Sequence, residues 1–240
     1  MAKRKSTMPK ATAAELEKAP EVKIEQALGR TEQWFEKNWK ALTTGVAVIL
    51  IITAGIFAYD TFIRATKSAR AADAMFVAEQ MFNSGDWATA LNGDGVNLGF
   101  VNVVASYGGT REARLAAHYA GICFLRQGDY DSALEYLGKY RAVKGVTGEV
   151  INAENEGLKG DIYVQKGDYA AAAGHFRTAV YATDNILTTP MYLKKLGLAL
   201  EAAGDYSGAV AAYKKVTYSY PTSLEARDIE KLAAAAEQKM

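Results

Sequence analysis

The most prominent hydrophobic feature of the chain is one unbroken apolar segment, ALTTGVAVILIITAGIFAY, at residues 41–59. Lys40 precedes it, Asp60 follows it, and no charged residue lies between them. As a helix, nineteen residues at about 1.5 Å each span roughly 28 Å, the thickness of one hydrocarbon core. A long helix that is apolar on every side needs lipid or the centre of a large protein around it. The segment therefore predicts a transmembrane helix, to which we assign residues 41–63.

The flanks of this segment indicate an anchor that is retained. Forty residues precede it, far more than the n-region of an ordinary signal peptide. Aromatic residues stand at both ends, as they do where membrane helices cross the two interfaces, and Ala54 and Ala58 form a small-xxx-small pair on which another helix can pack. The predicted anchor residues are Trp39, Gly45, Ala54, Ala58 and Tyr59.

The residues before the membrane helix divide into two parts. Residues 1–20 are polar, with mixed charge and two prolines, and are expected to form a disordered cytoplasmic tail. Residues 21–40 carry apolar side chains at spacings of three and four, which predicts an amphipathic helical segment. The first forty residues hold nine Lys and Arg, so the positive-inside rule favours a cytoplasmic N-terminus.

Four copies of one short phrase follow the apolar segment. Each consists of Gly, Asp and Tyr or Trp, with Ala three positions after the aromatic residue. The four glycines are spaced by 43, 39 and 37 residues, and a period of this length is typical of repeat architectures. The phrases begin at Gly85, Gly128, Gly167 and Gly204.

Positions on either side of each glycine indicate how one unit folds. Gly121 lies seven residues before Gly128, and Leu137 lies nine residues after it. Small residues occur where helices cross closely, and larger ones fill the gap beside them. Each unit is therefore predicted to be a helical hairpin that buries its apolar face by stacking on its neighbours. The same offsets select Gly160 and Phe176 in the next unit and Gly197 and Tyr213 in the last.

This pattern resembles the tetratricopeptide repeat, a unit of 34 residues. The resemblance implies an all-α fold in which the transmembrane helix precedes a tetratricopeptide-repeat α-solenoid over residues 64–240. The first unit matches poorly, because an insertion follows Ala90 and displaces the second helix to the apolar positions from Phe100 to Tyr107. The expected boundaries are 65–110 for the weak unit, 111–144, 150–184 and 190–221 for the others, and 223–238 for a capping helix started by a Thr222-x-x-Glu225 capping box.

Composition adds no candidate for catalysis. A net charge of +1 does not favour nucleic acid as a partner, which needs a strong basic excess. No HExxH, GxSxG or paired-cysteine motif is present, and the single cysteine, Cys123, sits in an apolar run typical of a buried residue. We therefore expect a protein that is not an enzyme, with no catalytic residues, no metal and no cofactor.

The insertion NGDGVNLG raises one further possibility. Asn92, Asp94 and Asn97 offer oxygen ligands for calcium on a glycine-rich loop. The ligand order of an EF-hand and its closing glutamate are missing, so a plain turn is favoured.

The resemblance also implies a concave groove lined by the first helix of each unit, where helical stacks bind partners. These positions combine apolar side chains with charges of both signs, and they lack the Lys and Arg cluster needed to hold acidic C-termini. The alternative is that several of them only pack against neighbouring helices. The protein-binding positions carried over are His118, Ile122, Leu125, Glu154, Asp161, Val164, Met191, Lys194, Leu198 and Glu201.

The order of tail, single membrane helix and repeats resembles the ancillary subunit of the bacterial Sec translocon. That resemblance implies a single-pass inner-membrane protein with a cytoplasmic N-terminus and a periplasmic repeat domain. The implied partners are Sec translocon subunits, a periplasmic chaperone and client polypeptides, besides the lipid around the helix. A scaffold for cell-envelope assembly or division, built on the same repeats, is the alternative.

Overall fold

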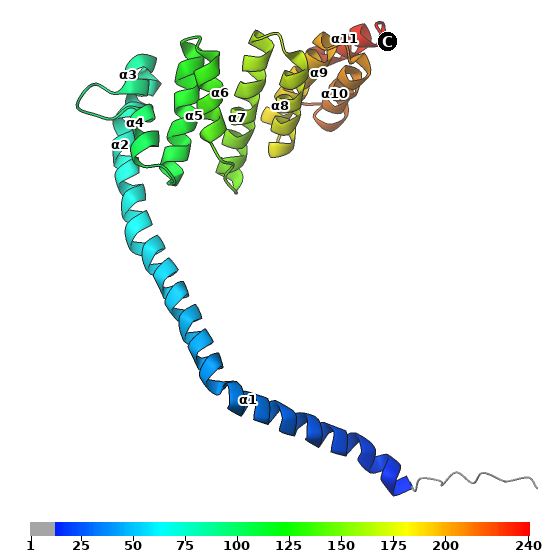
Figure 1. Cartoon of the computed structure of the whole chain (residues 1–240). Coiled ribbons are helices and arrows are strands. Elements are labelled where there is room, and N and C mark those ends of the chain that lie inside the picture. The colour runs from blue at the N-terminus through cyan, green and yellow to red at the C-terminus, as the bar shows by residue number, and fades with distance from the viewer. Residues whose placement is uncertain (1–12) are drawn as a thin grey trace, which may run out of the picture. The chain divides into compact units, whose positions relative to one another are not determined.

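The computed structural model describes the backbone of residues 13–240 and the side chains of residues 34, 36–145 and 148–240. Helix α1 (Ala13–Ala58) is followed by a π-helical turn, η1 (Tyr59–Arg64) (Figure 1). Residues 1–12 of the expected tail, and the apolar side chains expected before Trp34, lie outside this description. Residues 13–20 lie in α1 and not in a disordered tail, because most of this stretch consists of strong helix formers.

The segment expected to cross the membrane is helical throughout and exposed. The helical stretch Glu36–Ser84 contains an 18-residue window with a mean hydropathy of 2.3, and none of that window is buried against the described residues. Ile51 is 72 % exposed and Phe57 is 71 % exposed. The five predicted anchor residues are likewise exposed. By length and composition, this helix is able to cross a membrane.

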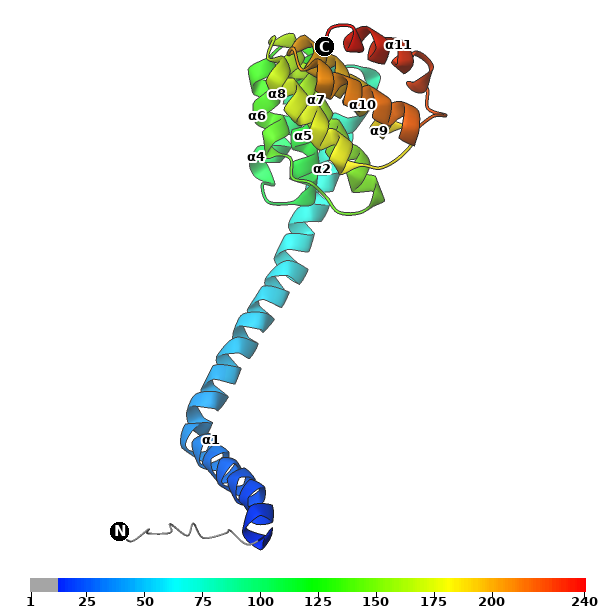
Figure 2. The same ribbon diagram turned by 90° about the vertical axis from the view of Figure 1, so that its right-hand side faces the viewer.

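Residues Arg64–Met240 form a second compact unit, in which the chain makes helices and no strand. Consecutive helices pack side by side as a stack of pairs, α5 with α6, α7 with α8 and α9 with α10 (Figure 1). Seen along the stack, α11 and the C-terminus lie at the near end, against α10 (Figure 2). The helices are α2 (Ala65–Ser84), α3 (Trp87–Asn92), α4 (Phe100–Ser106), α5 (Arg111–Arg126), α6 (Tyr130–Lys139), α7 (Val146–Gln165), α8 (Tyr169–Ala182), α9 (Thr188–Ala202), α10 (Tyr206–Ser219) and α11 (Ala226–Glu237).

The recurring Gly-Asp phrase is the turn inside each pair. Gly128 has a φ of 80°, a left-handed conformation that glycine adopts without steric strain at the end of a helix. Asp129 then caps the next helix, because its Oδ1 accepts a hydrogen bond from the Ser132 N–H at 3.1 Å. Hydrogen bonds from Ser132 also lower the pKa of Asp129. The same turn recurs at Gly85 and Asp86, Gly167 and Asp168, and Gly204 and Asp205.

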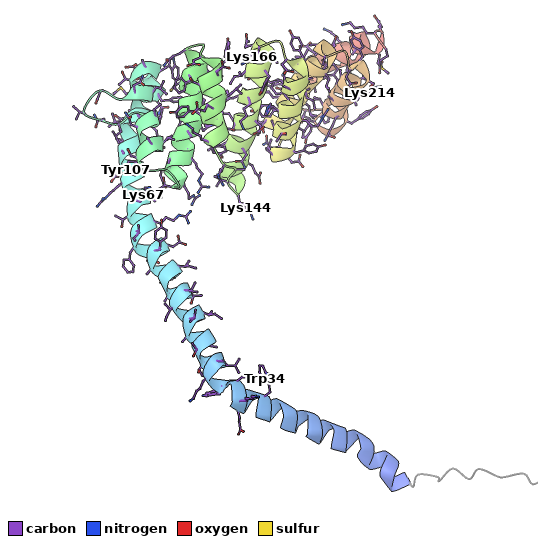
Figure 3. All side chains as sticks on the ribbon, in the orientation of Figure 1. Trp34, Lys67, Tyr107, Lys144, Lys166 and Lys214 are labelled. Carbon is purple, nitrogen blue, oxygen red and sulfur yellow. The ribbon has the colours of Figure 1, made fainter. Side chains whose placement is uncertain are left out.

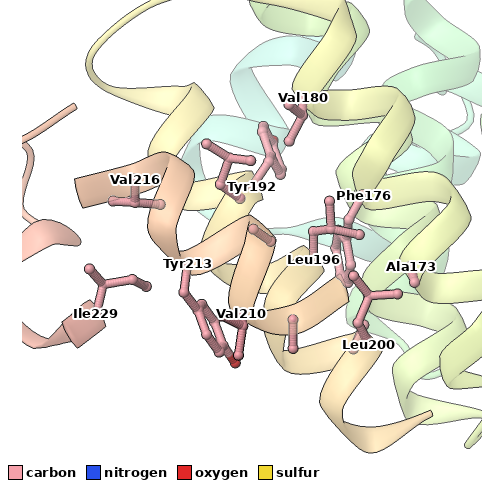
Figure 4. Close-up of a cluster of buried hydrophobic side chains, with 14 of the residues drawn as sticks. Ala173, Phe176, Val180, Tyr192, Leu196, Leu200, Val210, Tyr213, Val216 and Ile229 are labelled. Atoms are coloured by element: carbon pink, nitrogen blue, oxygen red, sulfur yellow. The ribbon is translucent and has the colours of Figure 1, made fainter. Parts of the chain in front are cut away.

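The predicted contact of small with large residues is present in the three well-matched units. A Cβ atom added to Gly160 would lie 2.6 Å from the Phe176 ring, and one added to Gly197 would lie 2.2 Å from the Tyr213 ring. Both aromatic side chains are buried in the C-terminal core (Figure 4). Only glycine therefore lets these helices cross at the observed separation. The third pair is Gly121 with Leu137.

The first unit has its second helix divided in two. Helix α3 ends at Asn92, a loop closed by a bridge between Gly93 and Leu98 follows, and α4 begins at Phe100. The Phe100 ring lies 5.3 Å from the Tyr119 ring of α5, centroid to centroid. The helix predicted to follow the insertion is therefore present as α4, and it supplies the packing of a second helix.

The capping box predicted at Thr222 and Glu225 does not form. Helix α11 begins only at Ala226, and no side chain caps it. The Ala226 N–H instead donates to the carbonyl oxygen of Ser223 at 3.3 Å, so turns occupy the residues where the helix was expected to start. Helix α11 still covers the end of the core, because it buries Ile229 and Ala236.

The glycine crossings lead to a first prediction. Gly197→Ala should destabilise the repeat unit by about 1–3 kcal/mol, because the new methyl group overlaps the Tyr213 ring. Thermal unfolding of the full chain in detergent, followed by circular dichroism, measures the change. Gly174→Ala in α8 is the matched control, because its Cβ meets no atom within 4 Å. A Gly197→Ala variant as stable as this control would contradict the assignment.

Candidate protein-binding surface

The predicted groove positions lie on the first helix of each pair, α5, α7 and α9. Helix α7 contacts both α5 and α9, so the three helices follow one another across the stack. The environments of the ten positions differ strongly along this row. Some side chains hold neighbouring repeats together, while others remain open to a partner.

His118 joins two repeats and is closed to solvent. Its residue is 1 % exposed, and its ring lies between α5 and α7. Its Nδ1 lies 3.1 Å from Asn155 Nδ2, and its Nε2 lies 3.5 Å from Glu154 Oε2. The structure therefore corrects the prediction of an open groove residue, because both ring nitrogens face polar groups of α7.

Most of the apolar positions pack inside the stack. Ile122 is 9 % exposed, and Leu125 packs against the small cluster of Ala133, Leu137 and Ile162. Ile122 and Leu125 therefore pack against neighbouring helices and are not open to a partner, which is the alternative given in the sequence analysis. Leu198 differs, because 44 % of it is exposed. Two further positions, Val164 and Met191, are partly buried against the C-terminal core.

Most of the charged positions have partners within the chain. The Lys195 ammonium lies 2.7 Å from Asp161 Oδ2, which links α9 to α7. Glu201 accepts hydrogen bonds from Lys239 at 2.6 Å and from the Tyr213 hydroxyl at 3.2 Å. Lys195 and Lys239 therefore partly neutralise the negative charges of Asp161 and Glu201. Lys194, on α9, is half-buried.

Glu154 is an open acid on this surface, with 49 % of its side chain exposed. Hydrogen bonding to His118 lowers the pKa of Glu154, against the opposing effect of burial. Tyr192 packs beside it, where a Cβ atom on Gly157 would lie 2.3 Å from the ring. Burial raises the pKa of Tyr192, and the charges of Glu154 and Asp161 add to the effect.

Tyr192 and Lys195 were missed by the sequence reasoning. Gly157 was the available signal, since a glycine within a helix often marks a close approach by another group. With Lys195 included, the open surface of α7 and α9 presents Glu154, the pair of Asp161 with Lys195, Lys194 and Leu198, while Tyr192 is buried against Gly157. This surface combines apolar area with both charge signs, which suits a polypeptide partner better than a single small ion.

The buried groups of the described residues do not assemble a reaction centre. Burial raises the pKa of the Cys123 thiol to about 12, so the nucleophilic thiolate does not form near neutral pH. His175 Nδ1 lies 2.9 Å from Glu156, which also holds Lys159 at 2.7 Å. This cluster is a packed ion network between α7 and α8. Among the described residues, no three His, Cys, Asp or Glu side chains are placed to hold a metal ion.

The inserted loop is a self-contained turn. Asp94 Oδ1 accepts hydrogen bonds from the N–H groups of Val96 at 2.8 Å and Asn97 at 2.6 Å, and Oδ2 accepts one from the Asn97 amide. These bonds, chiefly those from Asn97, lower the pKa of Asp94 to about 2. The carboxylate is thus engaged by its own loop, as the turn interpretation requires.

Parts of the helix pairs match sequence models of a known repeat family. Residues 158–223 match one sequence model of the tetratricopeptide repeat, and residues 116–142 match another. The chain contains tetratricopeptide repeats. Tetratricopeptide domains are protein-interaction modules and are typically not catalytic, so the row of α5, α7 and α9 belongs to a protein-binding module. No protein with a curated function matches the sequence.

A solved structure shares much of this fold. The crystal structure of the MamA protein superimposes with a TM-score of 0.50 at 18 % identity, over 70 % of this chain and 87 % of that chain. A second crystal structure of MamA gives a TM-score of 0.43 at 17 % identity, over 68 % of this chain and 91 % of that chain. At this identity, the likeness concerns the fold alone.

A second prediction concerns the polar junction between the repeats. The pKa of Glu154 is lowered from its ordinary value of 4.5, so its charge stabilises the folded state above that pH, and the contribution is lost as the pH falls through the lowered pKa. Glu154→Gln should lower the unfolding temperature by about 1–4 °C at pH 6, because a half-exposed pair contributes at most ~1 kcal/mol. The deficit should shrink as the pH falls below 4.5. The control is Glu149→Gln on the same helix, and an equal deficit in both variants would contradict the role of His118.

Proposed function

We propose that this chain is a membrane-anchored, non-enzymatic protein-binding module of the bacterial inner membrane. Its N-terminus lies in the cytoplasm, and its tetratricopeptide repeats lie in the periplasm. There they assist Sec-dependent protein translocation, or the periplasmic folding of clients, together with a chaperone. The observation that carries the proposal is the direct connection of an exposed apolar helix to a stack of protein-binding repeats.

The exposure of the apolar helix supports the anchor. Most large side chains of the apolar segment, among them Leu50 and Ile52, are more than half exposed within the chain. Burying one such side chain is worth about 1.5–3 kcal/mol, so leaving the whole window in water is unfavourable. A lipid bilayer removes that cost, and the length of the helix matches its core.

The surface of the repeats supports a polypeptide as the ligand. Leu198 offers apolar contact, while Glu154 and Lys194 offer charges of opposite sign on neighbouring helices. Such a surface can hold extended segments of varied sequence, because it does not depend on one fixed pair of charges. This breadth fits a factor that handles emerging or unfolded chains.

A third prediction tests the orientation. Val96 is 90 % exposed in the repeat unit, so Val96→Cys in spheroplasts should react with a membrane-impermeant maleimide. Lys37→Cys, before the span, should react only after lysis. The native Cys123 is buried and should stay silent in both variants. Labelling of Lys37→Cys in intact spheroplasts, with Val96→Cys protected, would reverse the proposed orientation.

A fourth prediction tests the partners. A photo-cross-linking residue in place of Leu198, on the open part of α9, should capture Sec translocon subunits or a membrane-anchored periplasmic chaperone. The same residue at Tyr218, which is 80 % exposed on α10, is the control and should capture them less. Capture of cell-wall or division proteins only, with localisation at the division site, would favour the alternative of an envelope scaffold.

A further inference from the structure

A cavity opens between the first turns of α5 and α7. Its volume is about 370 Å³, within the range of small-molecule sites. Leu115 of α5, Val143 of the connecting segment and Ile151 of α7 supply apolar walls, and all three are partly exposed. The cavity thus offers apolar surface that the chain itself leaves uncovered.

The connecting segment 140–145 is held in place as one wall of this cavity. Asn152 accepts a hydrogen bond from the Val143 N–H at 3.0 Å and donates one to the Val143 carbonyl oxygen at 2.9 Å. It also accepts one from the Tyr140 hydroxyl at 2.8 Å. Gly148 allows the close approach, since a Cβ atom there would lie 2.3 Å from the Val143 oxygen. The cavity is therefore built by specific contacts.

The charges in the lining favour an anion. Arg111 and Lys144 are exposed, and neither side chain has an ion pair or hydrogen bond with the described residues. Glu112 is the acid of the lining, and the Ser68 hydroxyl of α2 donates a hydrogen bond to it. The two cations and the apolar walls together complement an amphipathic ligand, one that has a negatively charged group and an apolar part.

The cavity is tied to the start of α2, the first helix of the repeat unit. The contact of Ser68 with Glu112 ties the start of α5 to the start of α2, and Lys67 donates a hydrogen bond to the Gly108 carbonyl oxygen at 3.0 Å. Nine positions of the sequence separate Ser68 from Tyr59, the last of the predicted anchor residues. Lys67, Tyr107 and Lys144 lie along one edge of the repeat unit, opposite Lys166 (Figure 3).

We propose that this edge binds anionic phospholipid of the membrane in which the chain is anchored. Arg111 and Lys144 hold the headgroup phosphate, and Leu115, Val143 and Ile151 contact the apolar part of the lipid. The inference rests on the membrane anchor of the proposed function. A lipid is favoured over a soluble acidic peptide, because a chain tethered to the membrane meets lipid at a high effective concentration.

The test uses the full chain in lipid nanodiscs. One set contains phosphatidylcholine alone, and the other contains an equal mixture of phosphatidylcholine and phosphatidylglycerol. Hydrogen exchange of the segment 141–145 should be slower in the mixed discs. Native mass spectrometry of the released chain should find phosphatidylglycerol retained in preference to phosphatidylcholine.

Two variants separate the site from general electrostatics. Each cation near an anionic surface contributes about fivefold in binding, so loss of both cations lowers retention roughly 30-fold. The double variant R111E/K144E also adds two acids and should retain at least about 30-fold less phosphatidylglycerol. Leu115→Trp fills the cavity without changing charge and should also remove the slow exchange. The double variant R227E/K231E on α11 makes an equal charge change away from the cavity and should behave as the original chain.

The outcomes distinguish this inference from the proposed function. A chain that fails to co-purify with discs of either composition overturns the anchor and the lipid site together. A chain that co-purifies, but exchanges equally fast in both discs, overturns the lipid site alone. If R227E/K231E retains as little phosphatidylglycerol as R111E/K144E, the net charge of the chain explains the retention, and the lipid site is overturned. Slow exchange produced by a soluble glutamate-rich peptide, and not by phosphatidylglycerol, would assign the cavity to an acidic polypeptide instead.

Discussion

The crossing of two helices at a glycine is the contact on which the repeat unit depends. Each well-matched pair places a glycine against a large side chain, and the Phe176 and Tyr213 rings fill the space that the missing Cβ leaves. This fixes how near the two helices of a pair lie. The left-handed glycine and the aspartate cap of each turn then set the direction in which the second helix of the pair runs back along the first. Pairs of the same shape can stack, and the stack presents its first helices as one surface.

The contacts between successive pairs decide what that surface offers. Between α5 and α7 the contact is polar, with His118 against Asn155, while between α7 and α9 it is Tyr192 against Gly157. Two neighbouring junctions of one stack are therefore filled by different chemistry. The polar junction keeps Glu154 at the surface with a lowered pKa, and the aromatic one supports the open residues of α9. A surface of this mixed kind, with apolar area and both charge signs, suits a protein partner.

The sequence predicts contacts within a pair better than contacts between pairs. The glycine and its large partner stand at fixed offsets from the turn, so Gly160 and Phe176 could be matched by counting alone. His118 could not be placed, because its burial depends on Asn155, which lies in another unit and follows no local pattern. The expected start of α11 failed because turns at Ser223 compete with the capping box. The cavity beside Val143 was also beyond the sequence, since it arises from the way Asn152 folds the connecting segment back.

The apolar interior of the repeat unit is not continuous. A large C-terminal cluster includes Phe176 and Tyr213, an N-terminal cluster includes Phe100 and Cys123, and a small middle cluster consists of Ala133, Leu137 and Ile162. Because stability in such stacks is a sum over neighbours, the thin middle cluster contributes less apolar burial between α6 and α7 than the larger clusters contribute among their own helices. A partner that pulls on the C-terminal pairs, against a chain fixed at its other end, would stretch the molecule there first. The domain would then act as a compliant mechanical link.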